Sequence, residues 1–142
     1  MGDRKNTVQH AALPFRMTET GPRILMVTSR ETRRWIIPKG WAKKNVEPQD
    51  MAAIEAFEEA GVRGKVKKKP VGEYRYDKRL DDGSSVVCDV TVHALEVTVE
   101  LPDWPERTQR ERRWFTPAEA VVVVSEPGLV DIFQKLAVKW ED

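Results

Sequence analysis

The sequence predicts a fold of the α/β or α+β class, built on one mixed β-sheet. Three observations predict it. Short apolar runs bounded by turn residues recur along the chain, as they do in strands. Two longer segments, residues 48–60 and 127–140, have the end signals or the apolar spacing of helices. Strand-like and helical segments intermix along 142 residues, which is enough chain for one domain, residues 1–142, and too little for a second.

The first half of the chain is predicted to form three strands and one helix. The strands are residues 10–15, 23–28 and 35–37. A Gly-Pro turn separates the first two, and a proline ends the third. A polar loop, residues 39–47, then enters the helix over residues 48–60. Pro48 fits the first helical turn, where its missing N–H is not needed, and Gly61 fits the left-handed position just past the end.

The second half is predicted to form a long antiparallel hairpin, one more strand and two helices. Residues 65–76 and 85–99 flank the turn sequence Asp-Asp-Gly at 81–83, so they are the two arms of the hairpin. A loop with two prolines follows at residues 103–109. The remaining elements are a strand, a short helix and a terminal helix, at residues 112–115, 117–124 and 127–140.

Composition limits the compartment and the partners. The 24 Lys and Arg nearly balance the 23 Asp and Glu, so no overall charge steers the molecule toward nucleic acid or an anionic membrane. Cys88 is the single cysteine and cannot form an internal disulfide, which favours a reducing, cytoplasmic location. No stretch approaches the roughly 18 apolar residues of a membrane span, so a soluble protein without a membrane partner is expected.

Three glutamates on one face of the first helix point to the chemistry. At 100° per residue, Glu55, Glu58 and Glu59 fall within about a third of the helix circumference. A solvated amphipathic helix would explain an acidic face, but residues 45–62 contain no Lys or Arg to offset the repulsion. Glu58 and Glu59 also lie in the last turn, where the helix dipole is already negative. This arrangement indicates that a cation is the missing partner.

A hard divalent cation suits these ligands. Mg²⁺, with Mn²⁺ as an alternative, prefers oxygen donors and is commonly held by a few carboxylates together with water and substrate phosphates. We therefore expect Glu55, Glu58 and Glu59 to be metal ligands. A glutamate that is not fully committed to the metal can take the proton of the attacking water. We give Glu58 this catalytic role, although the spacing leaves the choice among the three open.

At these residues the sequence resembles the Nudix hydrolase family. The positions that match the family box, with its spacing intact, are Gly40, Glu55, Ala56, Glu58, Glu59, Gly61 and Val62. Val46 replaces the first box glutamate and Ile54 replaces the box arginine. The resemblance implies an α/β/α sandwich with a mixed sheet and Mg²⁺-dependent hydrolysis of diphosphate bonds. In the family that arginine helps to orient the carboxylates; here a nearby Lys or Arg, or packing of Ile54, would take over the task.

Three further segments resemble one branch of the family. Residues 24–40, 103–115 and 133–136 are similar to the diphosphoinositol polyphosphate phosphohydrolases, which also cleave diadenosine polyphosphates. The resemblance implies a small-molecule polyphosphate substrate. The phosphate contacts that it implies are Thr28, Ser29, Arg30, Lys39, Gly40, Arg110, Arg112 and Lys135.

Two classes of function stay open at the level of sequence. The first is the hydrolase, and its substrate could be a diadenosine polyphosphate, an inositol pyrophosphate, a nucleoside triphosphate or a nucleotide sugar. The second is a non-catalytic nucleotide or polyphosphate sensor, suggested by Ile54 and Val46. A third option, an RNA-binding protein, is suggested by the basic run at residues 63–79. The near-neutral charge and the lack of an RNA-binding signature argue against it.

Overall fold

The computed structural model describes residues 7–141, with side chains described through residue 137. Its strands are β1 (Val8–Thr18), β2 (Gly21–Thr28), β3 (Trp35–Ile36), β4 (Lys39–Trp41), β5 (Val62–Val66), β6 (Gly72–Arg79), β7 (Ser85–Glu100) and β8 (Arg112–Phe115). Its helices are α1 (Pro48–Glu55), the π-helical turn η2 (Ala56–Ala60) that continues it, α2 (Pro117–Val123) and α3 (Pro127–Glu141). Within the described residues, no helix has the length and apolar content that crossing a membrane requires.

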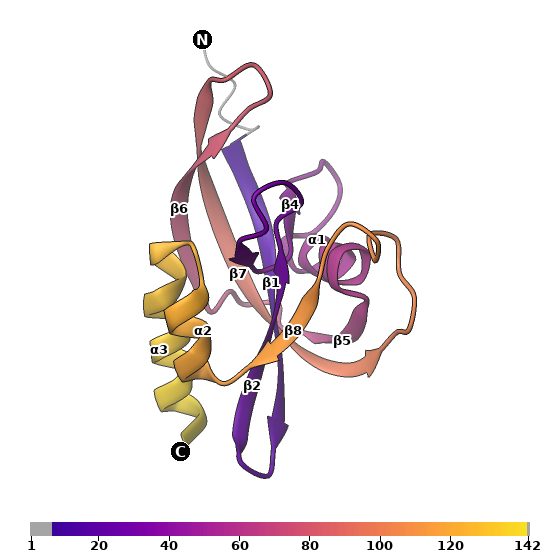
Figure 1. Cartoon of the computed structure of the whole chain (residues 1–142), viewed down its shortest axis with the longest axis vertical. Coiled ribbons are helices and arrows are strands. Elements are labelled where there is room, and N and C mark those ends of the chain that lie inside the picture. Colours follow the sequence, from indigo (N-terminus) through magenta and orange to yellow (C-terminus); the bar gives the residue numbers. More distant parts are fainter. Residues whose placement is uncertain (1–6, 142) are drawn as a thin grey trace.

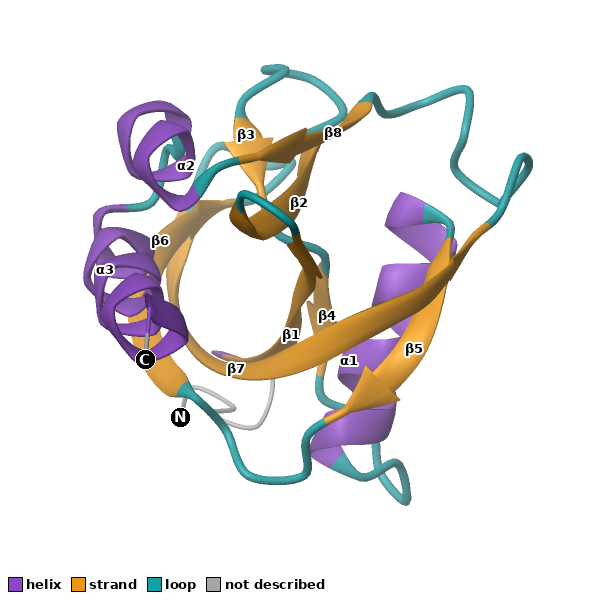
Figure 2. Ribbon diagram, turned by 90° about the horizontal axis from the view of Figure 1, so that it is seen from below, coloured by secondary structure: helices purple, strands orange, loops and turns teal. Residues whose placement is uncertain are grey.

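All eight strands belong to one mixed sheet, as predicted. Its spine has the order β3-β2-β1-β7-β5, while β4 pairs with β1, β6 with β7 and β8 with β2. Among the strands of residues 7–141, β1 and β7 are the parallel pair, and the other pairings are antiparallel. β7 is long enough to pair with β6 along its first half and with β5 at its end. The strands curve into an open ring when viewed along the molecule (Figure 2).

Helices cover both faces of this sheet (Figure 1). Because side chains alternate along a strand, Ala11 and Leu13 of β1 lie in the cluster that α3 covers, whereas Ala12 lies in the cluster that α1 covers. Helix α1 and turn η2 therefore pack on the face opposite to α2 and α3. This arrangement confirms the predicted mixed α/β/α architecture.

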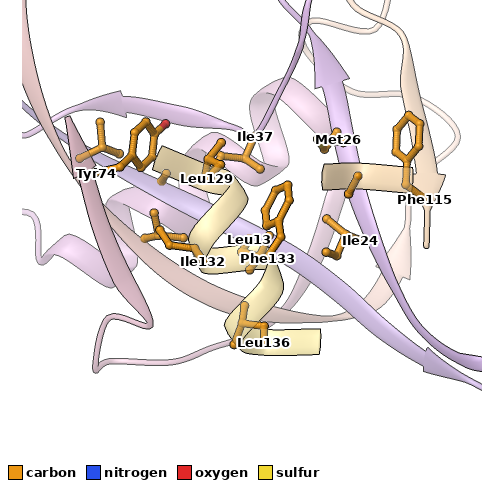
Figure 3. Close-up of a cluster of buried hydrophobic side chains, with 14 residues drawn as sticks. Leu13, Ile24, Met26, Ile37, Tyr74, Phe115, Leu129, Ile132, Phe133 and Leu136 are labelled. Atoms are coloured by element: carbon orange, nitrogen blue, oxygen red, sulfur yellow. The ribbon is translucent and has the colours of Figure 1, made fainter. Parts of the chain in front are cut away.

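Large apolar side chains fill the α3 face (Figure 3). Phe133 and Leu129 are fully buried, and Ile132 and Leu136 are nearly so. They recur at i, i+3, i+4 and i+7, so a single stripe of the helix meets the sheet. Full burial of one such side chain stabilises the fold by roughly 1.5–3 kcal/mol. Most of the tight apolar packing that joins a helix to the sheet is on this face.

The α1 face is packed by smaller residues. Ala52, Ala56 and Ala60 are all fully buried and lie against Leu25 and Leu95 of the sheet. Alanine at successive turns lets a helix backbone approach the strands closely. The next residues around the helix, including the glutamates, are thereby brought close to the strand ends.

Two predicted elements differ from the structure. The predicted loop at residues 39–47 begins as strand β4, because Lys39, Gly40 and Trp41 pair with Gln9–Ala11 of β1. The predicted first arm of the hairpin, residues 65–76, is divided between β5 and β6 by residues 67–71. Both corrections have one cause: the pairing partners are distant in sequence, so no local pattern of residues marks them.

Candidate active site

The end of the first helix is shaped by a change of pitch and by Gly61. The helix runs as α1 to Glu55 and then as one π-helical turn to Ala60. Gly61 has φ 66°, the left-handed conformation predicted for it. A Cβ at this position would also lie 2.5 Å from the Trp104 ring. A residue with a side chain would therefore be strained in its backbone and displaced by the loop before β8.

The segment before β8 binds the carbonyl groups that the helix leaves free. The last carbonyls of a helix have no partner within it. Here the Glu58 carbonyl accepts a bond from the Glu106 backbone N–H at 3.0 Å, and the Glu59 carbonyl accepts one from the Trp104 indole at 3.2 Å. The end of the first helix and the loop at residues 103–109 are thus one hydrogen-bonded unit.

Arg112 completes this set of contacts. Its Nη1 donates to the carbonyls of Ala60 at 2.9 Å and Gly61 at 3.2 Å, and its Nη2 donates to that of Leu101 at 2.9 Å. The guanidinium also stacks on the Trp104 ring, 4.0 Å from the centroid. The sequence suggested a phosphate contact at Arg112, whereas in the structure Nη1 binds the helix end and Nη2 binds the carbonyl of Leu101. This arginine supplies the positive charge that the last turn lacks.

Glu59 is a buried acid with one free oxygen. Its side chain is only 7% exposed, Oε2 lies 3.8 Å from Arg110 Nη2, and the buried Oε1 has no hydrogen-bond partner. Burial raises the pKa of Glu59 well above its ordinary value, and Arg110 opposes this shift. A side-chain hydrogen bond with Glu55 and the charge of Glu55 both add to it. An unpartnered buried carboxylate oxygen costs stability, so an absent ligand is its natural explanation.

Glu55 lies directly against Gly40 of β4. A Cβ on Gly40 would meet Glu55 Cδ at 2.5 Å and Oε2 at 2.7 Å, so only glycine leaves room for this carboxylate. Burial raises the pKa of Glu55, and the negative charge of Glu58 adds to the shift. The sequence suggested a phosphate contact at Gly40, and in the structure Gly40 leaves the room that Glu55 occupies.

Lys39 contacts Tyr76 of β6 and interacts electrostatically with Glu59. Its ammonium is 5.0 Å from the centroid of the Tyr76 ring. Burial lowers the pKa of Lys39, while the negative charges of Glu59 and Glu126 oppose this shift. The structure thus brings Lys39 into electrostatic contact with the buried acid of the helix.

Arg110 is engaged at every guanidinium nitrogen. Its Nε donates to Glu106 Oε1 at 2.8 Å and its Nη1 to the Thr28 carbonyl at 3.1 Å, and its Nη2 faces Glu59. The side chain is 8% exposed. The sequence suggested a phosphate contact here, whereas the structure gives Arg110 three partners within the protein. A basic cluster in a sequence does not reveal which of its members are already paired.

The predicted contacts at residues 28–30 are only partly free for a ligand. Thr28 is buried, and its backbone N–H and hydroxyl both bond to the Glu111 backbone. The Ser29 hydroxyl is bonded inside its own loop. Arg30 is exposed and donates to Gln109 at 3.4 Å, so it is the member of this group that is best placed to meet an anion from solvent.

The structure also shows the surroundings of two other predicted site residues, Glu58 and Lys135, and of Glu106, which was not predicted. Glu58 is half-buried, and no described residue gives its carboxylate a hydrogen bond or ion pair. Lys135 is exposed on α3, which covers the opposite face of the sheet from α1. Glu106 was not predicted, yet it pairs with Arg110 and its charge raises the pKa of Glu55. The i, i+4 spacing of Glu106 and Arg110 was the signal for it.

The donor set fits a hard divalent cation. Across residues 7–141, no three His, Cys, Asp or Glu side chains form a closed metal-binding group. Mg²⁺ does not need one, because one or two carboxylates together with water and substrate phosphates commonly hold it. The free Oε1 of Glu59 and the carboxylate of Glu55 on Gly40 meet this requirement.

Comparison with known proteins identifies the family. A model described as "NUDIX domain" matches residues 8–136. "Nudix hydrolase 12, mitochondrial" of Arabidopsis thaliana is 39% identical over 101 residues, which cover 69% of this chain and 50% of that protein. The human "Diphosphoinositol polyphosphate phosphohydrolase 3-beta" is 32% identical over 131 residues, which cover 89% of this chain and 75% of that protein. The chain spans about half to two thirds of the length of the first three relatives it matches, all described as mitochondrial, so a cytoplasmic location stays a prediction.

Solved structures share the fold. A Caenorhabditis elegans Ap4A hydrolase binary complex superposes with a TM-score of 0.69 at 13% identity, covering 94% of this chain and 96% of that one. The NUDIX domain of Shewanella oneidensis NrtR, complexed with ADP ribose, gives 0.67 at 10% identity, covering 92% and 88%. At such identities the likeness concerns the fold alone. Membership of the family rests on the model that matches residues 8–136. This chain belongs to the Nudix family.

Proposed function

We propose that the chain is a Mg²⁺-dependent hydrolase of phosphoanhydride bonds in a nucleoside or inositol polyphosphate, with Mn²⁺ as an alternative metal. One observation carries the proposal above the others. Glu59 is buried with an unpartnered Oε1, next to Glu55, at the end of a helix that contains no positive charge. Burial of a polar oxygen without a partner costs free energy, and a bound cation would satisfy it.

The residues of the helix divide the task among them. Glu55, Glu58 and Glu59 would hold the metal, with Gly40 leaving room for Glu55. A divalent ion bound there would polarise phosphate oxygens and lower the pKa of the attacking water. Glu58 is our candidate for the proton acceptor, because its half-buried carboxylate has no other described partner.

Three basic side chains outside the first helix suit a polyphosphate. Lys39 of β4 lies over the ring of Tyr76 in β6. Lys78 of β6 lies 6.0 Å from the centroid of the Trp41 ring in β4. Arg30 is exposed at the end of β2. These cations would bind the phosphates that the metal does not neutralise. We retain Arg30 and Lys39 as phosphate contacts and leave out Arg110 and Arg112.

The names of relatives support the class of substrate. Several are named diphosphoinositol polyphosphate phosphohydrolases, and structures of similar fold are Ap4A hydrolases. Both names describe compounds with phosphoanhydride bonds. We therefore propose a diadenosine polyphosphate or a diphosphoinositol polyphosphate as the substrate.

A hydrolysis panel tests the proposal. The purified chain is incubated with Mg²⁺ and a diadenosine polyphosphate, an inositol pyrophosphate, a nucleoside triphosphate or a nucleotide sugar, and the products are identified. We expect turnover of at least one of the first two, loss of turnover with a chelator, and a large loss in Glu58→Gln and Glu59→Gln. Glu19→Gln, at an exposed turn far from the site, is the matched control. Binding of these compounds without release of product would instead identify a sensor.

A further inference from the structure

The buried acid of the site has no positive partner on its own helix. Residues 48–60 contain no Lys or Arg, and Ile54, where the resemblance expects an orienting arginine, is an exposed apolar residue. Among the described residues, Arg110 is the basic side chain that lies within 4 Å of a Glu59 oxygen. The structure therefore brings the cation from a different element, the segment between β7 and β8.

The Arg110 guanidinium is held at two points before it reaches Glu59. Its Nε donates to Glu106 at 2.8 Å, and its Nη1 donates to the Thr28 carbonyl at 3.1 Å. The guanidinium group is a planar and rigid fork, so hydrogen bonds at two of its nitrogens also fix the direction of the third. That third nitrogen, Nη2, faces Glu59 Oε2 at 3.8 Å.

The supports of the fork are themselves fixed. Thr28 donates its backbone N–H to the Glu111 carbonyl at 3.0 Å, and its hydroxyl accepts a bond from the Glu111 backbone at 2.9 Å. These two bonds lock the residue that follows Arg110 onto the end of β2. Glu106 is tied to the helix by its own backbone bond to Glu58. Arg110 is thus held by Thr28 at the end of β2 and by Glu106 in the loop before β8.

We propose that Arg110 is the positioning residue of Glu59, holding Oε2 so that Oε1 stays free and directed into the site. This inference rests on the proposed function, because it assigns Oε1 a ligand. Arg110 would perform from outside the helix the task of an arginine at the position of Ile54. It is no substrate contact, since all of its nitrogens have partners in the protein.

Arginine and lysine should differ at this position if the fork matters. A lysine keeps the positive charge but has one nitrogen, so it cannot bind Glu106, Thr28 and Glu59 in fixed directions. Arg110→Lys therefore separates charge from positioning, and Arg110→Gln removes both. Arg112→Gln is the matched comparison, because Arg112 joins the same loop to the same helix through backbone carbonyls.

The kinetic arm measures kcat and KM with diadenosine tetraphosphate and Mg²⁺, and the melting temperature of each variant. We expect Arg110→Gln and Arg110→Lys both to lose about a hundredfold in kcat, with KM changing by less than about threefold, as a misplaced catalytic group would cause. Arg110→Lys should melt closer to the parent than Arg110→Gln does. Restoration of kcat by lysine, a loss expressed mainly in KM, or losses of kcat that only follow the melting temperature as in Arg112→Gln would each overturn the proposal.

A metal-free arm separates this inference from the proposed function. Side-chain NMR of Glu59, labelled with ¹³C in protein treated with chelator, reports whether the carboxylate keeps one rotamer. We expect one rotamer in the parent and in Arg112→Gln, and rotamer averaging in both Arg110 variants. A single Glu59 rotamer in Arg110→Gln would overturn the proposal even if the parent hydrolyses its substrate. Averaging in that variant would support the positioning role even if the hydrolysis panel failed.

Discussion

The two faces of the sheet are packed by different kinds of residue. On the α3 face, Phe133 and Leu129 are fully buried among other large apolar side chains. On the α1 face the helix residues of the buried cluster are small, Ala52, Ala56 and Ala60, and the acid Glu59 is also buried. The difference shows that the large apolar packing lies on one face, whereas the buried acid that we propose as a metal ligand lies on the other. Substitutions on the two faces should therefore have separable effects.

The largest expected effect is a loss of stability on the α3 face. Phe133→Ala removes a fully buried ring, and we expect the free energy of unfolding to fall by about 3–5 kcal/mol. Urea unfolding measures it, and Phe133→Leu is the milder companion if the alanine variant does not fold. Mn²⁺ affinity of the folded fraction should not change. A loss of less than about 1 kcal/mol, typical of an average substitution, would contradict the assignment of the main core to this face.

Two glycines, one on each face, sharpen the comparison. In Gly128→Ala the new Cβ would lie 2.4 Å from Tyr74 Cβ, an atom that cannot move without the strand. We expect the free energy of unfolding to fall by about 1–3 kcal/mol, as in overpacked cores. Mn²⁺ affinity, measured by electron paramagnetic resonance, should stay that of the parent. A change in affinity with no change in stability would reverse the roles given to the two faces.

Gly40→Ala is the counterpart on the α1 face. Its Cβ would meet the end of the Glu55 side chain, with Cδ at 2.5 Å, and a flexible carboxylate can turn away at little cost to the fold. We expect Mn²⁺ affinity to fall about tenfold, as for other groups that support a metal ligand, with a small change in melting temperature. Unchanged affinity would show that Glu55 is not a ligand in this position.

The pH dependence of metal-free stability provides a smaller effect on the same face. Burial raises the pKa of Glu59 and of Glu55 above the ordinary 4.5, so the native state keeps protons that the unfolded chain has released. The free energy of unfolding should therefore fall as pH rises through the interval above 4.5, and Mg²⁺ should offset the fall. Melting temperatures with chelator measure this slope. The Glu19→Gln control should show the same dependence of melting temperature on pH as the parent. If Glu59→Gln also showed that dependence, Glu59 would not be a buried acid with a raised pKa.

The smallest expected effect concerns Lys135, which the sequence suggested as a phosphate contact. It is exposed on α3, on the face away from α1. Lys135→Gln should change the free energies of folding and of substrate binding by less than about 0.5 kcal/mol. Steady-state kinetics decide the matter. A tenfold rise in KM would extend the binding site to the α3 face and break the comparison.

Local signals in the sequence were sufficient for most of the fold. Pro48 and Gly61 bounded the first helix, and the apolar spacing of residues 127–140 identified α3, because both signals belong to the element itself. Strand β4 was missed because three residues form it only by pairing with the distant β1. The π-helical turn at the end of the first helix has no local mark of this kind.

The sequence predicted the arrangement of the acidic residues of the site better than that of the basic ones. The three glutamates share a helix, so their spacing alone predicted a common face, and the structure brings Glu55 and Glu59 together at its end. The sequence suggested phosphate contacts at Arg110 and Arg112, and it did not reveal the partners that these arginines have within the protein. Their partners are Thr28 and the carbonyls of Ala60 and Gly61, which are far from them in sequence. The missing positive charge of the helix is supplied partly by these arginines.

The most direct test of the carboxylate site is the position of a bound metal. Crystals grown with Mn²⁺ would locate the ion by its anomalous scattering. We expect a peak at roughly 2.1 Å from Glu59 Oε1, the spacing of a magnesium-like ion, with Glu55 as a second ligand. A fully occupied Mn²⁺ elsewhere, with Glu59 Oε1 still unpartnered, would contradict the assignment of this helix end as the metal site.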